Sequence, residues 1–376
     1  MKAPITADPQ PVTFAELFFD LAFVFAVTQT VDLFEGEYSL ETILRATLAF
    51  WLIWGAWTQL TWTLNVADTS SRLVVLGTLF ATAMAFFMAI ALPSAFGGGV
   101  WLFVLAYLVI RAIGLGLDLW MSSATPGKMS TASRYALLSL PGIAAVLVGA
   151  ALGGTAQYVC WSLAVALELI PICVAGRSDN WSLHIPHFCE RHGLFVIVAL
   201  GETLIVAASG KSHLSAGVFV LVSALVVAIA GGMWWLYFHR LKGLMEEGLL
   251  RAKGNGQTAM ARDAYSLIHF LILCGIISFA IGIEHAMVHE ADHGSREIRL
   301  AGSFAVLLFG GGTVLAFWRT TGRILWVRLM LSLGTFVPIA LIVEMAPLVA
   351  LLLALGLIAV LVAVESKTLA RMSSTT

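Results

Sequence analysis

Long apolar runs recur along the chain, each close to 20 residues, and short polar or glycine- and proline-rich stretches separate them. A bilayer span needs about 20 mainly apolar residues. Twelve segments meet this length: 14–33, 43–65, 73–92, 100–120, 135–153, 156–175, 191–209, 214–239, 263–286, 298–318, 324–343 and 346–366. The fifth and sixth segments, and the last two, are the least clearly separated. The pattern predicts an all-α integral membrane protein with about twelve transmembrane helices.

The composition supports a membrane protein and argues against several classes of ligand. Of the 376 residues, 60% are hydrophobic and only 11% are charged, and the mean hydropathy is +0.93. Soluble domains are about one quarter charged. The four cysteines are scattered, the net charge is −1, and no basic stripe is present. We therefore expect no cysteine metal site and no nucleic-acid partner, and the lipid bilayer as the main partner. The sequence has no glycine-rich phosphate loop after a strand and no Gly-x-Ser-x-Gly elbow, so we also expect no cofactor and no enzyme activity.

The distribution of Lys and Arg predicts the orientation. With the N-terminus inside, four of the 21 Lys and Arg residues fall outside (Arg45, Lys211, Arg296 and Arg299) and Arg111 falls within a span. The remaining sixteen all fall on the cytoplasmic side. Cytoplasmic loops of membrane proteins carry this excess of positive charge. Both termini are predicted to be cytoplasmic.

Six predicted spans in each half indicate an internal duplication. Phe14-Ala-Glu16 has a counterpart in Phe188-Cys-Glu190, and Arg72 before the third segment is matched by Arg262 before the ninth. An even number of spans gives repeats that run parallel, related by an axis along the membrane normal. The sequence thus predicts two parallel six-helix repeats, residues 1–183 and 184–376.

Two carboxylates interrupt the first apolar segment. Glu16 and Asp20 are one turn apart, and a helix places Phe19 and Phe23 on the same face. Acidic residues inside membrane segments are costly and generally functional. The orientation places this pair near the cytoplasmic start of the helix, so we interpret it as the mouth of an ion or proton pathway.

A second carboxylate lies deeper, in the seventh segment. Glu190 and Arg191 begin this segment, and Glu202 shares a helical face with Arg191 about 16 Å further along. Gly201 beside it would allow the close approach of a neighbouring helix or the passage of an ion. Glu202 is therefore the candidate proton or cation site near the bilayer midplane, and the alternative is a structural acid neutralised by a buried arginine.

Further polar residues extend this set. Glu168, Arg111, Asp118 and His269 all lie inside predicted spans. Carboxylates and imidazoles in series are the usual components of proton relays. The alternative is pairwise charge neutralisation between helices, which is the favoured interpretation of Asp118 and Arg111 because they lie two turns apart on one helix.

His289-Glu-Ala-Asp-His293 matches the HExxH pattern of zinc proteases. It lies at the outer end of the ninth segment and is followed at once by Gly294, so a chance match in an outer loop is the favoured interpretation. We expect no metal site.

Two stretches together carry a family resemblance. Glu16-Leu-Phe-Phe-Asp-Leu-Ala-Phe-Val-Phe-Ala and Glu190-Arg-His-Gly-Leu-Phe-Val-Ile-Val-Ala-Leu-Gly-Glu202 resemble the bacterial low temperature requirement protein A (LtrA) family. The resemblance implies a polytopic protein of the bacterial inner membrane. A weaker similarity links Asp20, Phe23, Ala26 and Thr28 to the first helix of the lysosomal and bacterial potassium channels that open with Arg-x-x-x-Phe-Ser-Asp.

Taken together, the sequence favours translocation of a monovalent cation or a proton by a channel or transporter. Glu16, Asp20, Glu202, Glu168, His269 and Arg111 are the expected pathway residues. The alternatives are a non-transporting membrane factor in cold or stress adaptation and, least favoured, an HExxH metalloenzyme.

Overall fold

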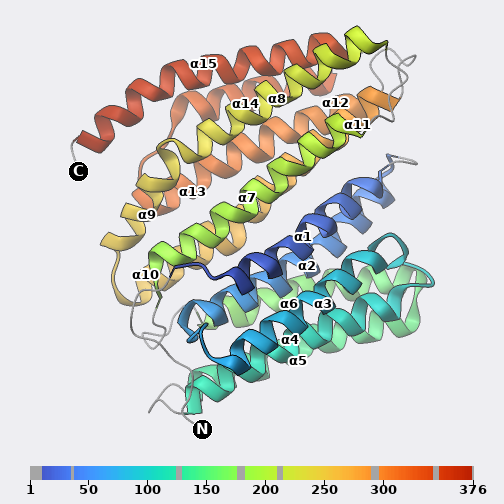
Figure 1. Cartoon of the computed structure of the whole chain (residues 1–376), viewed down its shortest axis with the longest axis vertical. Helices are drawn as coiled ribbons and strands as arrows, with labels where there is room; N and C mark the ends of the chain where they lie inside the picture. Colours follow the sequence, from blue (N-terminus) through green and yellow to red (C-terminus); the bar gives the residue numbers. More distant parts are fainter. Residues whose placement is uncertain are drawn as a thin grey trace. The chain divides into compact units, whose positions relative to one another are not determined.

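The computed structural model describes residues 11–34, 38–123, 129–175, 183–209, 215–288, 296–341 and 347–374. These residues form helices and connections, with no β-strand among them. The helices are α1 (Phe14–Asp32), α2 (Leu40–Val66), α3 (Arg72–Ala91), η1 (Leu92–Ser94), α4 (Val100–Ser123), α5 (Met129–Leu152), α6 (Gly154–Ala175), α7 (Ile185–Ala208), α8 (Ala216–Phe238), α9 (Leu241–Arg251), α10 (Gly254–Ala261), η2 (Arg262–Ile268), α11 (His269–Val288), α12 (Arg296–Ala305), η3 (Val306–Gly310), α13 (Gly311–Thr321), α14 (Trp326–Leu341) and α15 (Pro347–Ser374). Figure 1 shows their course.

Ten helical stretches of the described residues are long and apolar enough to cross a membrane. Each of the twelve segments expected from the sequence lies on a helix, and ten of them correspond to these stretches. The other two segments lie on α2, whose Trp, Thr and Gln side chains lower its hydropathy, and on α14, which is 16 residues long. The helical membrane architecture is confirmed, and the count of twelve stays a prediction.

The tight connection between α5 and α6 explains why these two segments are hard to separate in the sequence. α5 ends at Leu152, and Gly153 and Gly154 follow with φ of +65° and +51°. This left-handed conformation is unfavourable for residues with a Cβ. Two glycines therefore turn the chain without a polar loop, and α6 packs back along α5.

Contacts divide the chain into two compact units. The first comprises Met1–Arg191 together with Ala252–Arg262, and the second comprises His192–Arg251 together with Asp263–Thr376. The division falls within α7, so that this helix contributes its first residues to one unit and the rest to the other. The predicted duplication of 1–183 and 184–376 stays a prediction, because this division does not compare the two halves.

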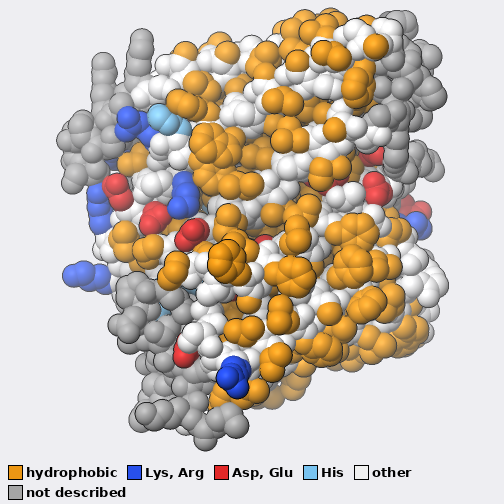
Figure 2. Space-filling model, in the orientation of Figure 1, with side chains coloured by type: hydrophobic (Ala, Val, Ile, Leu, Met, Phe, Trp, Pro, Cys, Tyr) orange, Lys and Arg blue, Asp and Glu red, His pale blue; other side chains and the backbone are white. Residues whose placement is uncertain are grey.

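Hydrophobic side chains cover most of the described surface in the view of Figure 2, and charged side chains gather mainly toward its edges. Many large apolar residues along the spans are exposed, among them Phe18, Leu76 and Val220. Water would make such a surface unfavourable, whereas lipid tails solvate it. The surface therefore fits a bilayer.

Two segments of π-helix, η2 before α11 and η3 between α12 and α13, interrupt the helices. Such segments occur mostly as single turns inside α-helices, frequently at functional sites. η3 packs against α11, where a Cβ at Gly275 would lie 2.3 Å from the backbone nitrogen of Phe309. Gly275 thus allows the two backbones to meet.

We expect Gly275→Ala to destabilise the protein by about 1–3 kcal/mol, because the added methyl group must push the two helices apart. The free energy of unfolding in mixed micelles measures this. Gly311→Ala is the matched control, since a Cβ there meets no described atom within 4 Å. Equal stability of the two variants would contradict the close approach.

Candidate functional site

Glu16 closes the first turn of α1. Thr13 is the N-cap: its backbone N–H and its hydroxyl both donate to Oε2 of Glu16, at 2.9 Å each, and its hydroxyl accepts from the Glu16 N–H at 3.4 Å. This reciprocal capping box fixes the start of a helix. Its effect here is to hold the Glu16 carboxylate at one position at the end of the first span.

Arg191 of α7 connects both acids of α1. Its Nη1 donates to Oε1 of Glu16 at 2.8 Å, and its Nη2 donates to Oδ1 of Asp20 at 2.6 Å. Trp57 of α2 donates its indole N–H to the same Asp20 oxygen at 2.7 Å, and the guanidinium carbon lies 5.7 Å from the Trp57 ring centre. All three charged side chains are buried. We call Glu16, Asp20, His187 and Arg191 the Arg191 cluster.

Asn65 at the end of α2 determines which ring nitrogen of His187 accepts a hydrogen bond. Its Oδ1 accepts from the His184 N–H at 2.8 Å and its Nδ2 donates to the His184 carbonyl at 3.0 Å, so the orientation of the amide is determined. The second Nδ2 hydrogen then points to Nδ1 of His187, 3.2 Å away, which must accept. The proton of a neutral His187 therefore lies on Nε2, 3.1 Å from Oε1 of Glu16.

The charges of the Arg191 cluster do not balance. Glu16 is surrounded by donors from Thr13, His187 and Arg191, so it is an ionised acceptor. With a neutral imidazole, two ionised carboxylates face one guanidinium. Oδ2 of Asp20 is buried and has no hydrogen-bond partner in the described part of the chain. Asp20 is thus the group at which a proton or a cation would balance the excess negative charge.

A second buried cluster in the same unit surrounds Arg111 of α4. Its Nη2 lies 3.8 Å from Oε1 of Glu168 on α6. The Tyr107 hydroxyl donates to the same Glu168 oxygen, and Tyr135 is hydrogen-bonded to Arg111. The ion pair of Arg111 is therefore with Glu168, whereas the sequence favoured Asp118, which is hydrogen-bonded to Thr63.

α2 lies between the two clusters. On one face, Trp57 donates a hydrogen bond to Asp20, and Asn65, two turns further along, donates one to His187. On the opposite face, Gln59 donates to the Arg111 carbonyl at 3.4 Å and Thr63 contacts Asp118. Residues two apart on a helix point in nearly opposite directions. This double role explains why α2 is polar for a membrane helix: it is buried on both sides and faces lipid little.

His269 and Glu202 belong to the second unit. Nδ1 of His269 is 2.7 Å from the Ala264 carbonyl, which can only accept, so Nε2 accepts from the Tyr237 hydroxyl at 2.6 Å. The Tyr265 ring stacks on the His269 ring with centroids 4.7 Å apart. Glu202 is buried on α7. Both residues are thus buried polar groups of the second unit.

One expectation for α7 is wrong, that for Gly201, and the repeat that pairs Glu190 with Glu16 stays a prediction. A Cβ at Gly201 would meet no described atom within 4 Å, so this glycine does not serve a close helix approach. Glu190, the expected counterpart of Glu16, is exposed, whereas Glu16 is buried. Helix periodicity assigns a residue to a face, but it does not say which face another helix will cover.

Sequence reasoning missed four polar or aromatic residues of and around the two clusters: Trp57, Asn65, Gln59 and His187. These residues lie in a predicted span and in a connection, where amides and aromatic rings are common. The signal was the repeated polar spacing in 55–65, which is unusual for a span whose faces all meet lipid. No group of three His, Cys, Asp or Glu able to hold a metal occurs among the described residues, and His289–His293 lies outside them.

The helices and the buried ion pairs define a polytopic α-helical membrane protein with charged clusters in its interior. Residues 11–364 match the model of the bacterial low temperature requirement A protein (LtrA) family. The chain belongs to this family. It is 29% identical over 341 residues to an uncharacterized protein of Rhizobium meliloti (strain 1021). The aligned region covers 85% of this chain and 80% of that protein. No solved structure matches the present chain.

Proposed function

We propose that this protein moves a monovalent cation or a proton across the bacterial membrane, and that Asp20 is the carboxylate that takes it up. The observation that carries the proposal is the charge imbalance of the Arg191 cluster. Two buried carboxylates share one guanidinium, and one oxygen of Asp20 has no partner in the described structure. Buried charges are normally paired, so an unbalanced carboxylate in a membrane indicates uptake of a positive charge.

The two acids would have different roles in this proposal. Glu16 is held by its capping box and by Arg191, so it keeps its charge and positions the guanidinium. Asp20 lies about 6 Å further along α1 and has the oxygen that can accept. The Lys and Arg distribution predicts that this end of α1 lies at the cytoplasmic side, so Asp20 would receive the ion from the cytoplasm or release it there.

Other polar groups would extend the pathway. Glu202 lies eleven residues beyond Arg191 on α7, about 16 Å deeper along the helix. The Tyr237–His269 pair offers a phenol and an imidazole in direct hydrogen bond, which can exchange a proton. The Arg111–Glu168 pair is a neutral pair on the other face of α2, and we assign it the role of holding α2 in place.

Ion flux into proteoliposomes tests the proposal. We expect purified wild-type protein to dissipate a proton, potassium or sodium gradient, and Asp20→Asn to slow this flux by roughly tenfold or more, because the amide cannot bind a proton or carry charge. Asp32→Asn is the matched control on the same helix. Its carboxylate accepts from Gln29 at the other end of α1, and the variant should transport normally.

Two results would contradict the proposal. The first is wild-type protein, monodisperse and folded, that moves none of the three ions. The second is Asp20→Asn protein that transports as fast as the wild type. Either result would favour the alternative of a membrane factor without transport, in which the buried charges only hold the helices together.

A further inference from the structure

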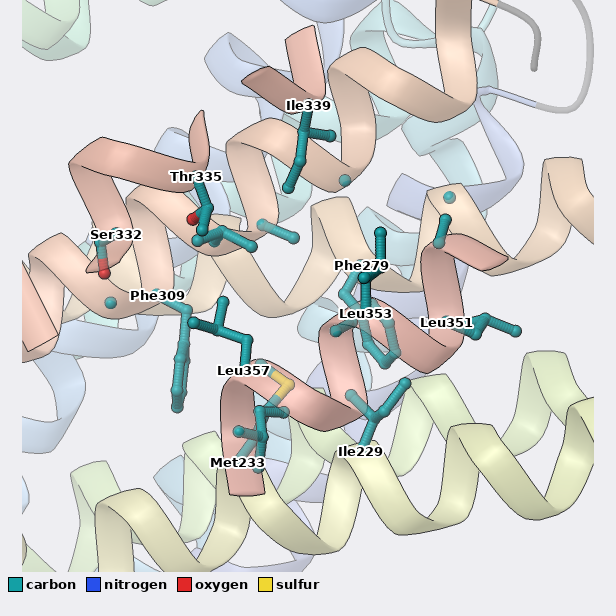
Figure 3. A pocket seen from close by; sticks show the side chains of 18 of the residues that line it. Ile229, Met233, Phe279, Phe309, Ser332, Thr335, Ile339, Leu351, Leu353 and Leu357 are labelled. Carbon is teal, nitrogen blue, oxygen red and sulfur yellow. The ribbon is translucent and has the colours of Figure 1, made fainter. Parts of the chain in front are cut away.

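The second unit contains an elongated apolar cavity. Its volume is about 360 Å³, and α8, α11, α12, η3, α14 and α15 line it. Figure 3 shows Met233 of α8, Phe309 of η3 and Leu357 of α15 around the same space. Sites for small ligands start at about 300 Å³ and are mostly apolar. The cavity is thus large enough for a molecule or for part of one.

The cavity runs along the helices. On α14 its lining extends from Arg328 to Ile339, on α15 from Ala350 to Leu361, and on α12 and η3 from Arg299 to Gly310. Eleven residues of helix span about 16 Å. Three helices therefore line it over the same length, and this long, narrow form fits an extended hydrocarbon chain better than a compact ring system.

The charged residues of the lining lie at opposite ends. Arg328 donates to Thr313, which follows Arg299 by fourteen residues on the α12–η3–α13 helix, so the two ends are about 21 Å apart. At the Arg328 end, the guanidinium is paired with Glu365. Between the ends, the hydroxyl of Thr335 donates to the Leu331 carbonyl of its own helix. The walls are therefore suited to hydrocarbon, with Arg299 at the other end.

We propose that this cavity holds one acyl chain of a membrane phospholipid, whose phosphate lies at Arg299. The lining helices α8, α11, α12 and α15 belong to candidate membrane spans, so lipid is the neighbouring medium. Unfilled space in a protein interior forfeits dispersion contacts on every wall, and an acyl chain restores them. Arginine binds phosphate oxygens through two parallel hydrogen bonds. This site is independent of the proposed ion translocation.

Gly302 provides a way to fill the cavity. It lines the space, and a Cβ added there meets no described atom within 4 Å, so Gly302→Leu places a side chain in the path of the lipid chain. Gly356→Leu is the matched control. Gly356 is exposed on α15, a Cβ there also meets nothing within 4 Å, and it is not part of the lining.

Photocrosslinking in nanodiscs tests the site, with a phosphatidylglycerol that carries a diazirine on one acyl chain and with labelled peptides mapped by mass spectrometry. We expect label on the lining residues of α12, α14 and α15, reduced about tenfold in Gly302→Leu because the leucine occupies the space, and unchanged in Gly356→Leu. Label confined to exposed residues, or equal label of the lining in both variants, would overturn the proposal.

A second probe tests the head group. A diacylglycerol with the same diazirine chain lacks the phosphate, so wild-type protein should label about tenfold less with it, as expected for the loss of a charge-assisted hydrogen bond. Arg299→Gln should remove this preference while the chain still enters. Equal labelling of the wild type by both probes would overturn the assignment of the phosphate to Arg299.

Discussion

Replacing Arg191 with glutamine should destabilise the protein by about 3–5 kcal/mol, the usual effect of removing one partner from a buried ion pair. Arg191 is fully buried and is the guanidinium bound to both Glu16 and Asp20. Without it, two carboxylates one turn apart would face each other in a site that water does not reach. The free energy of unfolding by SDS in mixed micelles measures the loss.

The chain supplies a control for this substitution. Arg251 also pairs with a carboxylate, that of Glu247 at 3.4 Å, but both side chains are about half exposed. Exposed pairs contribute at most about 1 kcal/mol, so Arg251→Gln should change stability little. Equal effects of Arg191→Gln and Arg251→Gln would contradict the buried cluster.

A triple variant separates charge from contact. If the instability of Arg191→Gln comes from unpaired negative charge, then adding Glu16→Gln and Asp20→Asn should recover much of the loss, because no buried charge remains. No recovery would mean that the hydrogen bonds of Arg191, including its position beside Trp57, matter more than the charge balance.

The helices of this protein could be predicted from its sequence, whereas their packing and the pairing of the buried charges could not. Apolar runs of span length gave the helices, because lipid requires every backbone group to be bonded within its own segment. The runs could not show that α2 is enclosed. Its hydropathy is lowered by the residues that serve the two clusters, so a helix at the centre of the first unit looks like a weaker span.

The site was predicted only through its charged members. Glu16, Asp20 and Arg191 stand out because charges are rare in spans, and the structure brings these three together. Their pairing could not be read from spacing, because Arg191 follows the acids by more than 170 residues. The roles of Asn65 and His187 could not be predicted from the sequence for another reason. Their importance rests on the orientation of one amide, which only the fold determines.

We expect Glu365→Gln to lower the free energy of unfolding by about 3–5 kcal/mol, because the Arg328 guanidinium stays buried without its carboxylate partner. Nε of Arg328 donates to Oε1 of Glu365 at 2.9 Å, and Nη2 donates to Oε2. The same guanidinium reaches Thr313 at 2.8 Å and the Leu236 carbonyl at 3.1 Å. One side chain of α14 thereby holds α8, α13 and α15.

The double variant Arg328→Met, Glu365→Leu decides what the pair contributes. Apolar residues of similar volume often replace a buried ion pair at little cost, so the double variant should unfold within about 1 kcal/mol of the wild type. A double variant as unstable as Glu365→Gln would show that the hydrogen bonds to Thr313 and Leu236 are needed in their own right.

The same double variant makes a prediction for the apolar cavity, because Arg328 lines one end of it. The substitutions keep that end hydrophobic, so acyl-chain crosslinking should persist even though the charge is gone.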